Sequence, residues 1–192
     1  MLTFASKKIL LEVLKTDKTS DVSLLVVQGG LISSNKGVNL PSTKITMPAL
    51  TPKDYKDAKL ACKLSFDWIA LSFVRSKNDV QELKELIAKN SKDTIPIISK
   101  IEKPQAIKKM DQILKASDGL MVARGDLGIE IPSEQVPLLQ KRIVYLAKKH
   151  RIPVIIATQM MESMIDSLKP SRAEVNDCLL YTSPSPRDRQ KS

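Results

Sequence analysis

The chain has 192 residues, of which 42% are hydrophobic and 27% charged. This composition excludes an intrinsically disordered protein and predicts one globular domain, or one domain with part of another. No apolar run approaches the roughly 18 residues of a membrane span, and the first residues lack the pattern of a secretory signal. We therefore expect no membrane partner and a cytoplasmic location.

The net charge of +10 raises nucleic acid as a candidate partner. However, the lysines are interleaved with acidic residues, and three tyrosines, three phenylalanines and one tryptophan are too few for a stacking platform. We expect no nucleic-acid partner and an excess charge that lies on a solvated face. The two cysteines and the single His150 have no zinc-ligand spacing.

The first 35 residues or so have the pattern of β structure. Two apolar runs, ILLEVL and VSLLVVQ, are separated by the turn-forming residues 15–21. A polar stretch follows at residues 33–41, where Gly37 and Pro41 interrupt the chain. This stretch predicts a boundary between the β segment and the rest of the chain.

Four short apolar runs recur between residues 67 and 158, with helical patterns between them. They are DWIALSF (67–73), IPIISKIE (95–102), DGLMVAR (118–124) and IPVIIAT (152–158). Almost wholly apolar runs are typical of parallel strands covered on both faces, so the alternation predicts successive βα units of the α/β class. A TIM (β/α)8 barrel and a doubly wound open sheet both fit. The absence of a Gly-rich phosphate fingerprint after any strand modestly favours the barrel.

Capping signals and apolar faces predict the intervening helices. Thr51 is the expected N-cap of the first helix, with Pro52 at its first position, and Ser76 opens the second. The fourth helix begins at Pro137 and runs to about His150. The apolar positions that predict the second and third helices are Val80, Leu83, Leu86 and Ile87, and Ile107, Met110, Ile113 and Leu114.

Polar side chains stand at the carboxyl ends of the apolar runs, where TIM barrels carry their active sites. Lys100 and Glu102 are two apart on an extended segment, so both should point to the same side. Asp126 ends the next run, and we expect it to meet Glu102 over the barrel mouth. Two carboxylates without a nearby histidine or cysteine suit a hard cation, Mg²⁺ or Mn²⁺. Lys100 beside them suits a substrate that carries or develops negative charge.

The turn Arg124-Gly125-Asp126 admits three interpretations: a catalytic strand end, a cell-adhesion tripeptide or an ordinary polar turn. Adhesion requires an exposed loop on a secreted protein, and no secretion signal supports it. Gly125 would let the backbone approach a ligand closely, because it has no Cβ. If residues 126–129 begin a helical turn, the N-terminus of that turn favours a substrate carboxylate. The catalytic and the polar-turn interpretations both stay open on these grounds.

Several stretches together resemble the pyruvate kinase family, and they occur in that family's order. The similarity covers essentially all of residues 7–177 and is most specific from residue 98 to residue 164. The stretches are NKGVNLP, DWIALSFVRS, IISKIE, LMVARGDLGIEIP, IPVIIATQMMESMI and PSRAEV.

The resemblance implies a phosphotransferase that converts phosphoenolpyruvate and ADP to pyruvate and ATP, the final step of glycolysis. It implies Mg²⁺ or Mn²⁺ as cofactor, K⁺ in the complete family with ligands outside this segment, and a homotetramer at full length. It also implies a partial TIM barrel. Residues 1–39 resemble the end of a small inserted β domain, and residues 40–177 resemble the middle barrel units with catalytic strand ends.

The resemblance also assigns roles to individual residues. Lys100 corresponds to the lysine that stabilises the transferring phosphoryl group, and Glu102 and Asp126 correspond to the ligands of the divalent cation. Gly125 and Asp126 match backbone positions that hold the substrate carboxylate. Thr158 matches the threonine that contacts the substrate where the enolpyruvate is protonated.

Lys36 resembles a lysine near the nucleotide phosphates. Other features depart from the family pattern. Lys103-Pro104 stands where an Asn-containing continuation is common. After Asp177 the match stops, and residues 178–192 form a polar, Pro- and Ser-rich tail that we interpret as non-native and disordered.

The departures leave two alternatives to an active pyruvate kinase. The chain could be a catalytically inactive fragment, because a partial barrel leaves strand edges unpaired. It could instead be another Mg²⁺-dependent TIM-barrel lyase or aldolase that acts on pyruvate or its enol. Such an enzyme would share the paired carboxylates but would not need Lys36 or a site for ADP.

Overall fold

A computed structural model describes residues 2–4, 9–34, 38–39, 48–158, 160–171, 174–175 and 177. The chain separates into two compact units, Met1–Ile156 and Ala157–Ser192. Lys36 and residues 178–192 lie outside the described residues, so the predictions made for them stay predictions. The same holds for the domain boundary between residues 39 and 40.

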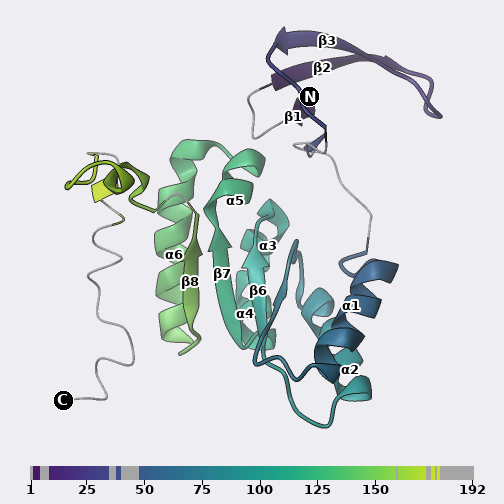
Figure 1. The fold of residues 1–192 in the computed structure, drawn as a ribbon, viewed down its shortest axis with the longest axis vertical. Coiled ribbons are helices and arrows are strands. Elements are labelled where there is room, and N and C mark those ends of the chain that lie inside the picture. The colour runs from purple at the N-terminus through teal and green to yellow at the C-terminus, as the bar shows by residue number, and fades with distance from the viewer. Residues whose placement is uncertain are drawn as a thin grey trace. The chain divides into compact units, whose positions relative to one another are not determined.

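The N-terminal residues form an antiparallel sheet, as the two apolar runs predict. Its strands are β1 (Leu2–Phe4), β2 (Ile9–Thr16), β3 (Val22–Gln28) and β4 (Val38–Asn39), in the order β3-β2-β1-β4 (Figure 1). In β2 and β3 only Ile9 and Leu11 are buried. Most of this sheet's described side chains are therefore exposed.

The turn between β2 and β3 is organised by one carboxylate. The Asp17 side chain accepts hydrogen bonds from the backbone N–H groups of Thr19 at 2.9 Å, Ser20 at 3.0 Å and Asp21 at 2.9 Å. It also accepts from the hydroxyls of Thr19 and Ser20. Hydrogen bonds to the ionised form, above all that from the Thr19 hydroxyl, hold the pKa of Asp17 well below its ordinary value.

The four apolar runs of residues 67–158 form the second sheet, in sequence order. Its strands are β5 (Ile69–Leu71), β6 (Ile97–Ile101), β7 (Gly119–Ala123) and β8 (Val154–Ala157). The pairs β5–β6 and β6–β7 are parallel. The predicted βα units are thereby confirmed, and within the described residues they form an open four-stranded sheet rather than a closed barrel.

The helices α1 (Pro52–Lys63), α2 (Lys77–Asn90), α4 (Met110–Ala116) and α6 (Val136–Lys149) pack beside one another in chain order, with α1 on α2, α2 on α4, and α4 on α6 (Figure 1). Thr51 caps the first helix as predicted: its hydroxyl accepts from the Asp54 N–H at 3.3 Å, and its own N–H donates to the Asp54 carboxylate at 2.7 Å. In the part of the chain that the structure describes, no helix combines the length and apolarity needed to cross a bilayer. The helices are α1 (Pro52–Lys63), α2 (Lys77–Asn90), α3 (Pro104–Lys108), α4 (Met110–Ala116), α5 (Arg124–Glu130) and α6 (Val136–Lys149), with 3₁₀ turns η1 (Ser133–Gln135) and η2 (Glu162–Ile165).

The third predicted helix is two helices, which is a correction to the sequence prediction. The chain leaves helical geometry at Lys109, whose ψ of 21° differs from the usual value of about −42°. The Lys109 N–H closes the last turn of α3 on the Ala106 carbonyl, and its own carbonyl accepts the first bond of α4. Met110, Ile113 and Leu114 are buried as predicted, whereas in α3 Ala106 is more deeply buried than Ile107.

Buried and partly exposed side chains alternate along strand β6, so its two faces lie in different environments. Ile97, Ser99 and Ile101 are fully buried, whereas the intervening residues are partly exposed. The Ser99 hydroxyl lies 2.6 Å from the Ser117 hydroxyl, which in turn donates to the Ile113 carbonyl at 2.7 Å. Since Ser117 uses its hydrogen there, Ser99 is the donor of the pair. This bond fixes β6 to the end of α4.

Asp118 sets the register between β6 and β7. Its carboxylate accepts from the Ile97 N–H at 2.9 Å, and its own N–H donates to the Ile97 carbonyl at 3.1 Å. The second carboxylate oxygen lies 3.3 Å from the ammonium of Lys84 on α2, in a half-exposed ion pair. Asp118 therefore holds the start of β7 against the start of β6.

We predict that Asp118→Ala lowers the free energy of unfolding by about 1–3 kcal/mol, because the Ile97 N–H loses its acceptor in the sheet. Amide hydrogen exchange should accelerate at Ile97 in particular. The matched control is Lys84→Met, which removes only the exposed ion pair and should change stability by less than about 1 kcal/mol. Equal effects of the two substitutions would contradict this role of Asp118.

In the second unit, the Glu174 carboxylate connects two parts of the chain by hydrogen bonds, at Ser163 and at Ser171. Glu174 accepts the backbone N–H groups of Ser163 at 3.1 Å and Ser171 at 2.9 Å. The hydroxyls of Ser163 and Ser171 also donate to it. These bonds, with the Ser163 hydroxyl first, lower the pKa of Glu174 from the ordinary 4.5 to about 2.

The lowered pKa predicts a pH-dependent contribution of Glu174 to stability. Because the folded state holds the carboxylate ionised, the contribution is complete above pH 4.5 and disappears as the pH falls from 4.5 to about 2. Thermal unfolding of the chain and of Glu174→Gln should differ at pH 6, and the difference should close over that interval. A difference that does not vary with pH would rule out the prediction.

Candidate active site

The lysine and the carboxylate at the end of β6 lie in contact. The Lys100 ammonium lies 2.6 Å from Glu102 Oε1 and donates to the Ser72 hydroxyl at 2.9 Å. The Glu102 side chain is 1% exposed and that of Lys100 is 24% exposed. Both side chains therefore share one side of the strand, as the alternation predicts. Ser72, which follows β5, joins the neighbouring strand end to this pair.

The two oxygens of Glu102 have different surroundings. Oε2 accepts the Phe73 backbone N–H at 2.8 Å, which fixes the orientation of the carboxylate. Oε1 is buried and has no partner in hydrogen-bond geometry among the described residues, although its distance to Lys100 is that of an ion pair. The two observations agree if the ammonium lies close to Oε1 but points its hydrogens elsewhere, one of them at Ser72.

A buried carboxylate charge is costly unless its surroundings compensate it, and here the Lys100 ammonium 2.6 Å away compensates Oε1 as an ion pair rather than as a hydrogen bond. A hard cation prefers carboxylate oxygens and keeps water or substrate oxygens in its remaining positions. The surroundings of Glu102 Oε1 therefore fit a cation ligand. Among the described residues, no group of three or more His, Cys, Asp and Glu side chains is arranged to hold a metal ion.

Phe73 presents its N–H to Glu102 from an unusual backbone conformation. Its φ of 55° lies in the left-handed region, which for a non-glycine residue costs on the order of 1–3 kcal/mol. The strand β5 ends two residues earlier, and the left-handed turn directs the peptide N–H at the carboxylate. Strain of this kind persists only where surrounding contacts hold it.

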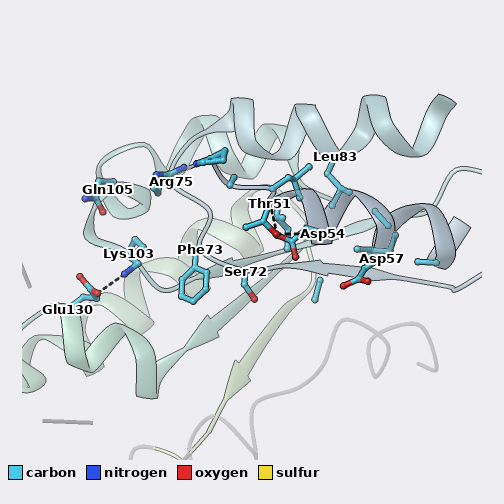
Figure 2. Close-up of a pocket in the computed structure, with 18 of the residues that line it drawn as sticks. Thr51, Asp54, Asp57, Ser72, Phe73, Arg75, Leu83, Lys103, Gln105 and Glu130 are labelled. Atoms are coloured by element: carbon cyan, nitrogen blue, oxygen red, sulfur yellow. Dashed lines mark hydrogen bonds and ion pairs between the residues drawn. The ribbon is translucent and has the colours of Figure 1, made fainter. Parts of the chain in front are cut away.

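One such contact comes from Lys103, directly after Glu102. The Lys103 ammonium lies 5.4 Å from the centroid of the Phe73 ring and 2.6 Å from Glu130 Oε1 (Figure 2). The Lys103 and Glu130 side chains are only 17% and 11% exposed. Figure 2 shows this pair beside Phe73 at one end of a cleft of about 710 Å³, which α1, β5 and the loop after β5 line.

The helix α5 begins at the end of β7, so the helical turn predicted at residues 126–129 is present within it. Asp126 lies exposed in its first turn, and its carboxylate makes no hydrogen bond or ion pair with the described residues. Gly125 is the second residue of the helix. Arg124 Nη1 lies 3.5 Å from Oε1 of the buried Gln140 on α6, so its side chain supports the start of α5.

Thr158 follows β8 directly and lies in the second unit, with a left-handed φ of 67° and an exposed side chain. The structure thus brings Lys100 and Glu102 together and places Gly125 and Asp126 at the end of the next strand. The meeting of Glu102 and Asp126, and the roles of Thr158 and Lys36, stay predictions.

The sequence prediction missed Phe73, Lys103 and Glu130. A backbone N–H carries no residue-type signal, so the bond from Phe73 to Glu102 could not be read from the pattern. Lys103 and Glu130 are 27 residues apart, and each resembles an ordinary surface charge in sequence. The sequence did contain one signal for Lys103: Lys103-Pro104 stands where an Asn-containing continuation is common in the family.

Parallel βα units with a lysine paired to a buried carboxylate at the strand ends define an α/β-barrel segment that carries a polar site. The family model described as "Pyruvate kinase, barrel domain" matches residues 2–180. The chain therefore belongs to the pyruvate kinase family.

Curated relatives agree with this assignment. The chain is 51% identical over 158 residues to a pyruvate kinase of Corynebacterium efficiens, which covers 82% of this chain and 33% of that protein. It is 50% identical over 157 residues to pyruvate kinase 2 of Synechocystis, covering 82% and 26%, and 47% identical over 170 residues to a pyruvate kinase of Thermotoga maritima, covering 88% and 36%. The chain thus spans roughly a third or less of each of these relatives' length.

Proposed function

We propose that this chain supplies catalytic barrel units of a pyruvate kinase that transfers the phosphoryl group of phosphoenolpyruvate to ADP. The observation that carries the proposal is the pair at the end of β6, an ammonium 2.6 Å from a buried carboxylate oxygen that accepts no hydrogen bond from the described residues. Phosphoryl transfer depends mainly on positioning and on neutralising charge, and this pair offers one group for each task.

The proposed cation is Mg²⁺ or Mn²⁺, held by Glu102 and Asp126. When bound, the cation would supply positive charge that offsets the charge on substrate oxygens. Glu102 contributes a preoriented ligand, because the Phe73 N–H holds its other oxygen at 2.8 Å. The exposed Asp126 carboxylate would contribute the second ligand from the first turn of α5. K⁺ is expected from the family, with ligands outside this chain.

The chain's own residues would act on the substrate from three strand ends. Lys100, held by Ser72, would place its ammonium against the transferring phosphoryl group as the bond between phosphorus and the enol oxygen breaks. Backbone groups of Gly125 and Asp126 would hold the substrate carboxylate. Thr158 would contact the enolate where it gains a proton to become pyruvate, and Lys36 would lie near the phosphates of ADP.

The remaining proposals concern the full-length protein. From the family we infer a cytoplasmic homotetramer whose small-molecule partners are phosphoenolpyruvate and ADP or ATP. Residues 1–39 would be the end of an inserted β domain, and residues 40–177 would be part of the barrel. Neither nucleic acid nor a membrane is a proposed partner.

A chimera tests the proposal, with residues 2–177 replacing the matching stretch of the Corynebacterium efficiens enzyme. We predict ADP-dependent formation of pyruvate from phosphoenolpyruvate, and a fall in turnover of at least about 100-fold in Lys100→Met, because the transferring phosphoryl group loses its ammonium. Mn²⁺ binding should persist in that variant.

The control in the chimera is Lys84→Met, which removes an equal charge on α2 and should leave turnover close to that of the parent. Near-parental turnover in Lys100→Met would refute the assigned role. An aldol or lyase reaction in the absence of ADP activity would favour the other class of barrel enzyme.

A further inference from the structure

Lys103 connects the chain segments that follow three successive strands. It lies directly after Glu102 at the end of β6 and contacts the ring of Phe73 in the loop after β5. It also pairs with Glu130 at the end of α5, the helix that follows β7. The loop after β5 reaches the carboxylate of Glu102 through the Phe73 N–H, so a change at Lys103 can act on that carboxylate through Phe73.

The contact with Phe73 connects Lys103 to the carboxylate. The Phe73 N–H is the donor to Glu102 Oε2, and its backbone stands in the left-handed region. Phe73 is 54% exposed, so burial alone does not hold the residue in place. An ammonium within about 6 Å of a ring centroid attracts the ring, and the observed distance is 5.4 Å.

The pair with Glu130 makes this attachment rigid. An exposed lysine would sample many rotamers, but the Lys103 and Glu130 side chains are 17% and 11% exposed and their charged atoms lie 2.6 Å apart. A pair removed from water to this extent keeps its geometry, because separating it would leave a desolvated charge without a partner. Glu130 thus fixes the ammonium over the ring.

The structure assigns Lys103 as a positioning residue: with Glu130 it clamps Phe73, so that the Phe73 N–H holds Glu102 Oε2 and leaves Oε1 for the cation. This inference rests on the proposed function, because it takes Glu102 as a cation ligand. Groups that orient metal ligands through hydrogen bonds typically change metal affinity by 10- to 100-fold when they are removed.

The direction in which cation affinity changes when Lys103 is removed distinguishes a positioning role from simple charge repulsion. Removing a positive charge near a cation site should tighten cation binding if the charge acts only through repulsion. If Lys103 positions the carboxylate, its removal should weaken binding despite the lower repulsion. The two roles therefore predict opposite changes in the same dissociation constant.

The experiment is a titration of the complete 192-residue chain with Mn²⁺ alone, in which electron paramagnetic resonance measures the free ion. Lys103→Met should raise the dissociation constant about 10- to 100-fold, and Lys103→Arg, which keeps the charge over the ring, should restore most of the affinity. Phe73→Leu keeps both charges and the N–H but removes the ring, and it should also weaken binding. Lys84→Met is the control for loss of a distant ammonium and should leave the constant unchanged.

The outcomes distinguish this inference from the proposed function. If Glu102→Gln leaves Mn²⁺ affinity unchanged, or if the parent chain binds no Mn²⁺, the proposed metal site fails and the inference fails with it. If Glu102→Gln weakens binding but Lys103→Met leaves it unchanged or tightens it, only the positioning role is overturned. Should Lys103→Met not fold, Phe73→Leu decides: parental affinity in that variant overturns the clamp.

Discussion

The site depends on the buried carboxylate of Glu102, which is 1% exposed and, among the described residues, has only one of its oxygens in a hydrogen bond. A charge in that position is tolerated only when its surroundings supply compensating groups. The Phe73 N–H and the Lys100 ammonium provide part of this compensation, and a cation on Oε1 would complete it. The surrounding loops can be understood as the framework that holds these groups in place.

The fold produces this arrangement through the two faces of β6. Ile97, Ser99 and Ile101 fill one side and fasten the strand to the helices, with the Ser99–Ser117 bond fixing its position. The same alternation sends Lys100 and Glu102 to the opposite side, which Ile98 shares. The packing of the buried face of β6 therefore determines how precisely Lys100 and Glu102 are positioned on the other face.

The sequence predicted those parts of the fold that depend on local patterns. Apolar runs gave β5 to β8 in order, Thr51 and Ser76 began helices as expected, and the spacing of Lys100 and Glu102 placed them on one side. The break at Lys109 was not predicted, because the apolar spacing continues across it. The left-handed Phe73 and the pair between Lys103 and Glu130 depend on contacts between segments 27 or more residues apart, which no local pattern encodes. The pairing of Glu102 with Asp126 in one metal site remains a prediction.

The most direct measurement is anomalous diffraction from crystals of the chimera soaked in Mn²⁺. The account predicts a single strong peak within about 2.3 Å of Glu102 Oε1 and of an Asp126 carboxylate oxygen, with Glu102 Oε2 still bonded to the Phe73 N–H. A peak that contacts neither carboxylate, or one that contacts Glu102 through Oε2, would contradict the claim that this carboxylate is held in place to bind a cation.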